Sequence, residues 1–187
     1  MTQSRPNGVD VQQPLATIDA VKGDPALAEF EFRARTEWRS GAHVQTQIQG
    51  FSGVKQEDRS RAQPFVLEGD EPPVLLGSNQ GPNAVELLLA GLTACLSVGI
   101  AYNAAARGIV IEAMTLDVTG DIDLRGFLGI PESVRAGCHD IHIACHIKSP
   151  ASDQVIADLL DHVQNTSPVT DMVRHPTPVH VKFVRDS

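Results

Sequence analysis

The sequence predicts an α+β fold in which antiparallel sheets cover one long central helix. Three observations support this prediction. A single long apolar segment, residues 83–108, lies between segments with strand alternation. Helical patterns follow it without the regular strand–helix alternation of a parallel α/β sheet. The 187 residues, 42% hydrophobic and 20% charged, can bury the core of one domain.

The polar residues 1–14 predict a flexible N-terminal arm, which leaves residues 15–187 as a single domain. From Glu29, the alternating stretch EFEFRARTEW predicts a half-buried strand. Ser40 and Gly41 favour a turn, so HVQTQIQGF is expected to return as the hairpin partner.

The next segment is charged, and we expect residues 52–62 to be exposed. QPFVLEGDEPPVLLG then predicts a short strand followed by a proline-bounded loop. This loop leads into the long helix, where Asn83 and Glu86 have the spacing of a capping box and Gly108 suits the C-terminal position. Apolar residues occupy much of the helix circumference, so the helix should be buried on more than one side.

Two further segments with strand alternation, residues 109–124 and 138–148, are expected to pair as antiparallel strands. Ser149 followed by proline predicts the start of an amphipathic helix, and Ser167 followed by proline the start of a short helix. The final alternating stretch PVHVKFV predicts a closing strand.

Charge and composition exclude several function classes. The net charge of -8 disfavours nucleic acids and anionic membranes. We see no apolar run near the roughly 20 residues that span a bilayer and no secretory signal, so we expect a cytoplasmic protein. The three cysteines form no CxxC motif and are expected to be free thiols.

Cys95, in the middle of the long helix, is the first candidate for chemistry. Its neighbours on the helix face are apolar, which favours a packed, inert thiol. Cys145 alternates with isoleucines and is expected in the core. Cys138, Asp140 and His142 would share one strand face and are residue types that ligate metals, but one strand rarely completes a metal site. We therefore expect a solvated polar face and no metal or cofactor.

The joint pattern of DEP, GPN-x-x-ELLLA, a mid-helix cysteine and SPV resembles the OsmC/Ohr family of osmotically inducible and organic hydroperoxide resistance proteins. The resemblance extends from about Phe30 to the C-terminus, and it implies an interlocked homodimer. It also implies thiol peroxidase chemistry, in which a helix cysteine attacks the peroxide and a second cysteine resolves the sulfenic acid. In the family's chemistry that the resemblance implies, an Arg–Glu pair activates the attacking thiol. Cys95 matches the attacking position.

Two departures from the family pattern affect this expectation. Ser167 occupies the position of the resolving cysteine and cannot form a disulfide. The carboxylate position, ten residues before the cysteine, is Val85, and Glu86 lies about half a turn away from Cys95 around the helix. Glu86 is therefore better explained as a capping residue than as a catalytic one. Arg39 is the nearest candidate for the arginine, with Arg33 and Arg35 as alternatives.

Two functions follow from the sequence. In the first, Cys95 reduces organic hydroperoxides in an oxidative stress response, and an external thiol regenerates it. The alternative is an inactive protein of the same fold that binds a hydrophobic small molecule at the dimer interface. Loss of both the carboxylate and the resolving thiol supports the alternative, and retention of Cys95 supports the first function.

Overall fold

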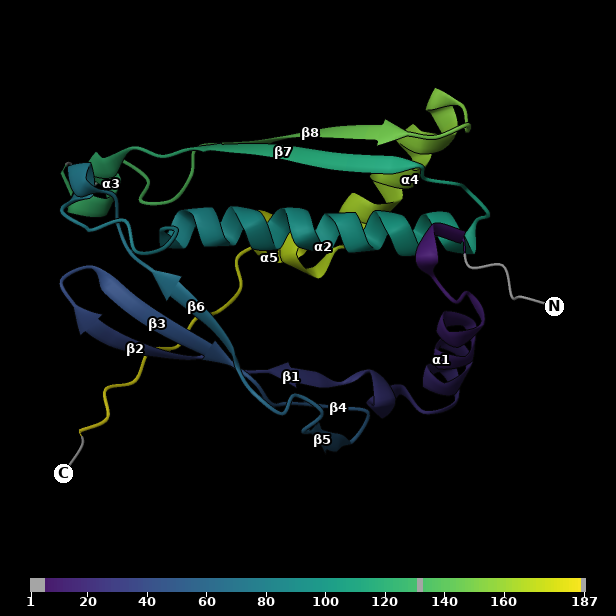
Figure 1. Cartoon of the computed structure of the whole chain (residues 1–187), viewed down its shortest axis with the longest axis horizontal. Helices are drawn as coiled ribbons and strands as arrows, with labels where there is room; N and C mark the ends of the chain where they lie inside the picture. The colour runs from purple at the N-terminus through teal and green to yellow at the C-terminus, as the bar shows by residue number, and fades with distance from the viewer. Residues whose placement is uncertain (1–5, 131–132, 186–187) are drawn as a thin grey trace. The chain divides into compact units, whose positions relative to one another are not determined.

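The structure is a computed structural model that describes residues 6–130 and 133–185 (Figure 1). The chain divides into two compact units. Of the described residues, the first unit contains Asp10–Ala90, and the second contains Pro6–Val9 and the chain from Gly91 onward. Antiparallel sheets and one long helix confirm the predicted α+β class.

The first unit contains two three-stranded antiparallel sheets, with strand orders β1-β4-β5 and β2-β3-β6. The predicted hairpin at Ser40 and Gly41 is confirmed, because Trp38 pairs with Val44. The strand predicted over residues 29–38 is instead divided between the two sheets. The strands are β1 (Phe30–Phe32), β2 (Arg35–Ser40), β3 (His43–Ile48), β4 (Phe51–Gly53), β5 (Gln56–Asp58) and β6 (Phe65–Gly69).

Two parts of the first unit were not predicted. The β4–β5 hairpin lies within the charged segment that was expected only to be exposed. Its turn residues, Val54 and Lys55, both have positive φ values, as a tight hairpin turn requires. Helix α1 (Gln12–Gly23) and the 3-10 turns η2 (Pro25–Ala28) and η3 (Pro73–Leu75) complete this unit.

Part of the predicted N-terminal arm is ordered against the second unit. Pro6–Gly8 form the 3-10 turn η1. The Asn7 side chain donates a hydrogen bond to the Ile109 carbonyl at 2.9 Å and accepts one from the Ile111 N–H at 2.8 Å. Residues 1–5 of the arm lie outside the described residues.

In the second unit, a two-stranded antiparallel sheet packs with helices around one core. β7 and β8 lie side by side (Figure 1) and pair from Ala113–Lys148 to Asp121–Asp140. Leu92, Leu96 and Ile100 of α2 and two residues of α4 are buried, and the inward residues of both strands pack on them. The helices and strands are α2 (Ala84–Ala106), β7 (Ala113–Asp121), α3 (Leu124–Leu128), β8 (Asp140–Lys148), α4 (Asp153–Thr166) and α5 (Pro168–Arg174). The start of α2, up to Ala90, belongs to the first unit, and the rest of the helix belongs to the second.

One predicted helix start and one predicted strand in the second unit were wrong. Helix α4 begins at Asp153 with Ser152 as its N-cap. Ser149 instead forms a turn, donating a hydrogen bond to the Val110 carbonyl. The predicted closing strand is not formed within the chain. Its residues 178–184 pair with no described strand, and the side chain of Val181 is 95% exposed.

The expectation about membrane spans also requires correction. Helix α2 has 23 residues and is apolar enough to cross a membrane by length and composition alone. Core helices of soluble proteins pass the same test. Because Leu92, Leu96 and Ile100 of this helix are buried in the core of the second unit, we interpret α2 as a core helix.

Candidate functional site

Cys95 lies beside Ser167, although the two residues are far apart in the sequence. The Cys95 Sγ and Ser167 Oγ atoms are 3.3 Å apart. Cys95 is half-buried on α2, and Ser167 is 5% exposed at the junction of α4 and α5. Core packing brings them together, because buried residues of α4 join those of α2 in one cluster. The thiol thus has a polar neighbour that the apolar pattern of its own helix did not indicate.

Ser167 is held by Thr170, which lies three residues further along. The Ser167 hydroxyl accepts a hydrogen bond from the Thr170 N–H at 3.3 Å and another from the Thr170 hydroxyl at 2.9 Å. The first of these bonds confirms the predicted N-cap role of Ser167 at the start of α5. Thr170 was missed as part of the site. The sequence SPVT carried the available signal, because Thr170 lies three positions after Ser167 and the N–H at that position donates to an N-cap oxygen.

The glutamate and the arginines that were candidates to activate Cys95 all make other contacts within the first unit. Glu86 accepts from the Asn83 N–H at 2.8 Å and donates its own N–H to the Asn83 side chain at 2.9 Å, which confirms the capping box. Arg39 pairs with Glu37 at 3.0 Å and also donates to the Gln45 side chain. Arg33 pairs with Glu31 and Glu57, and Arg35 with Glu37.

The other two cysteines have different surroundings. Cys145 faces the core from β8, and burial raises the pKa of its thiol, so it is a poor nucleophile near neutral pH. Cys138 precedes β8 and is not on the strand, contrary to the prediction. His142 instead pairs with Asp140 at 3.2 Å. Within the described ranges, no group of three His, Cys, Asp or Glu side chains is arranged to hold a metal ion.

Asp70 organises the loop that leads into α2. Its side chain is 4% exposed and accepts hydrogen bonds from the N–H groups of Glu71, Ser78 and Gln80, at 2.8 to 3.1 Å. These backbone donors, Gln80 foremost, lower the pKa of the Asp70 carboxyl. The sequence analysis assigned this aspartate no role, although a carboxylate before a proline-rich loop is a common way to satisfy loop N–H groups.

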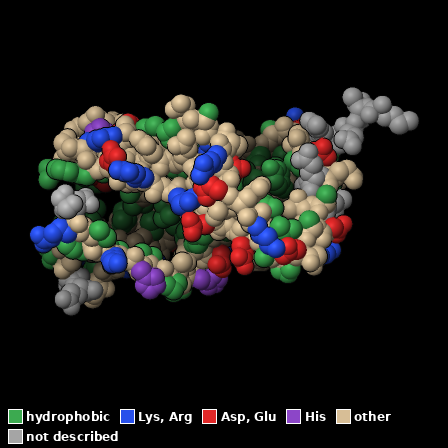
Figure 2. Space-filling view, turned by 90° about the horizontal axis from the view of Figure 1, so that it is seen from below, with side chains coloured by type: hydrophobic (Ala, Val, Ile, Leu, Met, Phe, Trp, Pro, Cys, Tyr) green, Lys and Arg blue, Asp and Glu red, His purple; other side chains and the backbone are tan. Residues whose placement is uncertain are grey.

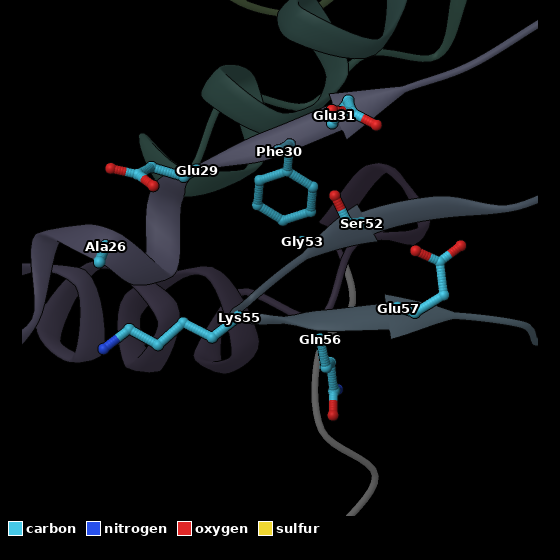
Figure 3. A pocket seen from close by; sticks show the side chains of 9 residues that line it. All are labelled: Ala26, Glu29, Phe30, Glu31, Ser52, Gly53, Lys55, Gln56 and Glu57. Atoms are coloured by element: carbon cyan, nitrogen blue, oxygen red, sulfur yellow. The ribbon is translucent and has the colours of Figure 1, made fainter.

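An open cavity of about 570 Å³ lies in the first unit (Figure 3). The Phe30 ring lies against Gly53, where an added Cβ would meet the ring at 2.2 Å. Three of the four charged residues that line the cavity are paired, since Glu31 and Glu57 contact Arg33 and Lys55 contacts Asp24. All lining residues belong to the first unit, and Cys95 is not among them.

A family model for OsmC-like proteins matches residues 77–182, which contain the whole of α2, Cys95 and Ser167. The chain belongs to the OsmC-like protein family.

Solved structures share the fold of this OsmC-like protein at low sequence identity. An OsmC-like protein from Mycoplasma pneumoniae is 19% identical with a TM-score of 0.59, over 78% of this chain and 89% of that one. An organic hydroperoxide resistance protein OsmC from Legionella pneumophila is 18% identical with a TM-score of 0.50, over 76% and 88%. An organic hydroperoxide resistance protein from Elizabethkingia anophelis is 16% identical with a TM-score of 0.50, over 78% of this chain and 90% of that one. No curated protein matched the sequence.

Proposed function

We propose that this OsmC-like protein reduces organic hydroperoxides at Cys95, with an external thiol as the reductant. The observation that carries the proposal is the 3.3 Å contact between Cys95 and Ser167. It supports the assignment of Cys95 to the attacking position, because Ser167 stands where the family has its resolving cysteine. The relatives from Legionella pneumophila and Elizabethkingia anophelis are described as organic hydroperoxide resistance proteins, in agreement with this chemistry.

The reaction begins with the Cys95 thiolate. Its sulfur attacks the peroxide oxygen that carries hydrogen, so the S–O bond forms as the O–O bond breaks. Sulfur loses two electrons to the peroxide, and the leaving alkoxide takes a proton from water to become an alcohol. Cys95 is then a sulfenic acid, which remains reversible while a thiol is available.

Regeneration requires thiols from outside the chain. Ser167 cannot condense with a sulfenic acid to form a disulfide, and Cys145 is held in the core from β8. One external thiol condenses with the Cys95 sulfenic acid, releasing water and forming a mixed disulfide. A second thiol attacks that disulfide and restores Cys95. Small thiols are abundant in the reducing cytoplasm, which is the compartment that we propose for this protein.

The experiment compares the wild type with Cys95→Ser. Each purified protein is mixed with cumene hydroperoxide or a fatty-acid hydroperoxide, and dithiothreitol or a dihydrolipoyl compound supplies the electrons. We expect peroxide consumption by the wild type and only the background rate with Cys95→Ser. Cys138→Ser is the matched control and should retain the wild-type rate.

Equal peroxide consumption by the wild type and Cys95→Ser would contradict the proposal. That result would favour the alternative function, an inactive protein of this fold that binds a hydrophobic small molecule at its dimer interface. Consumption that disappears with Cys138→Ser as well as with Cys95→Ser would mean that a second cysteine takes part, and the one-cysteine cycle would be wrong.

We also propose that the protein is a homodimer. Large apolar side chains are exposed in the single chain, and Figure 2 shows hydrophobic groups on the surface of one face among mixed charges. Trp38 is 71% exposed and Phe127 is 77% exposed. Monomeric proteins rarely leave such surfaces in water, and a second copy of the chain can cover them.

A further inference from the structure

We infer that Ser167 is a catalytic residue that donates its hydroxyl proton to the Cys95 sulfur, and that Thr170 is the positioning residue that fixes the direction of this bond. The inference deepens the proposed function and rests on it for its chemical purpose. The hydrogen bond itself is a property of the resting protein, so it can be tested separately from peroxide reduction.

The direction of the bond follows from counting donors and acceptors. A serine hydroxyl has one O–H donor and two acceptor lone pairs. The Thr170 N–H and the Thr170 hydroxyl both donate to Ser167 Oγ, which occupies the two lone pairs. Ser167 therefore has no lone pair left to accept from a Cys95 S–H. Its own proton remains, and Cys95 Sγ is the neighbouring acceptor at 3.3 Å.

A donor aimed at sulfur favours the thiolate over the thiol. A hydrogen bond to a charged group is stronger than one to a neutral group, so it stabilises the ionised state selectively. Burial strengthens the effect, because Ser167 and Thr170 are 5% and 7% exposed and water competes poorly for their hydrogen bonds. The same Ser167 hydroxyl can donate to the sulfenate oxygen that forms on Cys95.

The Ser167 hydroxyl thus stands in the place of the family's resolving thiol but has a different role. A cysteine at this position would consume the sulfenic acid by forming a disulfide, whereas Ser167 stabilises the oxidised sulfur and leaves it for an external thiol.

The charged groups of the surrounding helices lie elsewhere. On α2, no Asp, Glu, Lys, Arg or His lies between Glu86 and Arg107. On α5, Asp171 pairs with His175 at 2.8 Å, and Arg174 donates to Gln164 at 3.0 Å. The carboxylates and His162 of α4 are at exposed positions. The polar contact described for the Cys95 sulfur is therefore the Ser167 hydroxyl, and both hydrogen bonds from Thr170 end on that hydroxyl oxygen.

The test measures alkylation of Cys95 by iodoacetamide across a range of pH, with peptide mapping to separate it from the other cysteines. Ser167→Ala removes the hydrogen bond to the sulfur, so alkylation at pH 7 should slow roughly tenfold. Thr170→Val, which keeps the capping N–H, should slow it roughly threefold. Ser167→Thr keeps a hydroxyl and the cap and should restore the wild-type profile.

Ser97→Ala is the matched control. Its hydroxyl lies two residues from Cys95 but donates to the Thr93 carbonyl, so its removal should leave the profile unchanged. Circular dichroism tests whether each variant is folded. If Ser167→Ala does not fold, Thr170→Val and Ser167→Thr carry the test.

A wild-type profile in Ser167→Ala would overturn the inference. If that variant does not fold, a wild-type profile in Thr170→Val would overturn it. An equal shift in Ser97→Ala would also overturn it, because the effect would then not be specific to Ser167. If the predicted shifts occur but neither the wild type nor any variant consumes hydroperoxide, the donor role holds and only the proposed function fails.

Discussion

At the scale of single residues, the candidate site combines local hydrogen bonds at helix starts with one contact between residues far apart in the sequence. The capping box of Asn83 and Glu86 and the N-cap at Ser167 were both predicted, because their partners lie three residues away. The contact between Cys95 and Ser167 spans 72 positions and depends on how α4 packs on α2, so no spacing rule could find it. Only the family resemblance connected the two residues.

Asp70 gives a prediction at this scale. Its pKa is lowered in the folded state, so its contribution to stability is present above the unfolded value near 4 and is lost as the pH falls through the folded value. Asp70→Asn removes the negative charge that accepts the hydrogen bonds from the backbone N–H groups of the loop. We expect its urea midpoint to be lower than that of the wild type at pH 7, with the difference disappearing in acid.

The control is Asp117→Asn, because Asp117 lies on an exposed face and pairs with His146 at 3.2 Å. Exposed ion pairs contribute little, so this variant should match the wild type at both pH values. A loss of stability by Asp70→Asn that is the same at pH 7 and in acid would mean that the charge of Asp70 is not the cause.

At the scale of elements, strong periodicity was a reliable guide. Helices α2 and α4 and strands β7 and β8 are all close to their predicted positions, because each presents a continuous apolar face to the same core. The short strands β1, β4 and β5 were not separated by the sequence analysis, since three residues show no period and their partners are chosen by the rest of the sheet. The C-terminal segment alternates but pairs with no strand in the described part of the chain, so pattern alone predicted a strand there.

The contact between α2 and α4 gives the prediction at this scale. A Cβ added at Gly99 would lie 2.8 Å from a methyl group of Val163, which is 1% exposed and stiff because it is β-branched. Gly99→Ala should therefore overpack the core and lower the free energy of unfolding by about 1–3 kcal/mol.

Gly91 on the same helix is the matched control, because an added Cβ there meets nothing within 4 Å. Gly91→Ala should be neutral or raise the free energy of unfolding by up to about 1 kcal/mol, the helix preference of alanine over glycine. Chemical denaturation of both variants measures the difference. Gly99→Ala with the stability of Gly91→Ala would show that the two helices do not approach as closely as described.

At the scale of the whole molecule, the apolar circumference of the long helix predicted burial on more than one side, which we attribute to a second copy of the chain. The single chain supports that expectation, since Val98 and Tyr102 of α2 are exposed along with Trp38 and Phe127. Light scattering at micromolar concentration should give about 40 kDa, twice the 20.1 kDa of one chain. A mass of one chain would contradict the proposed homodimer.

The central claim is that peroxide oxidises the sulfur atom of Cys95, and the most direct measurement follows that sulfur. The protein is treated with less than one equivalent of cumene hydroperoxide in the presence of dimedone, and each cysteine peptide is then examined by mass spectrometry. We predict that the sulfenic acid adduct forms on Cys95, while Cys138 and Cys145 stay reduced. Adducts spread equally over the three cysteines, or found on Cys138 alone, would contradict the account.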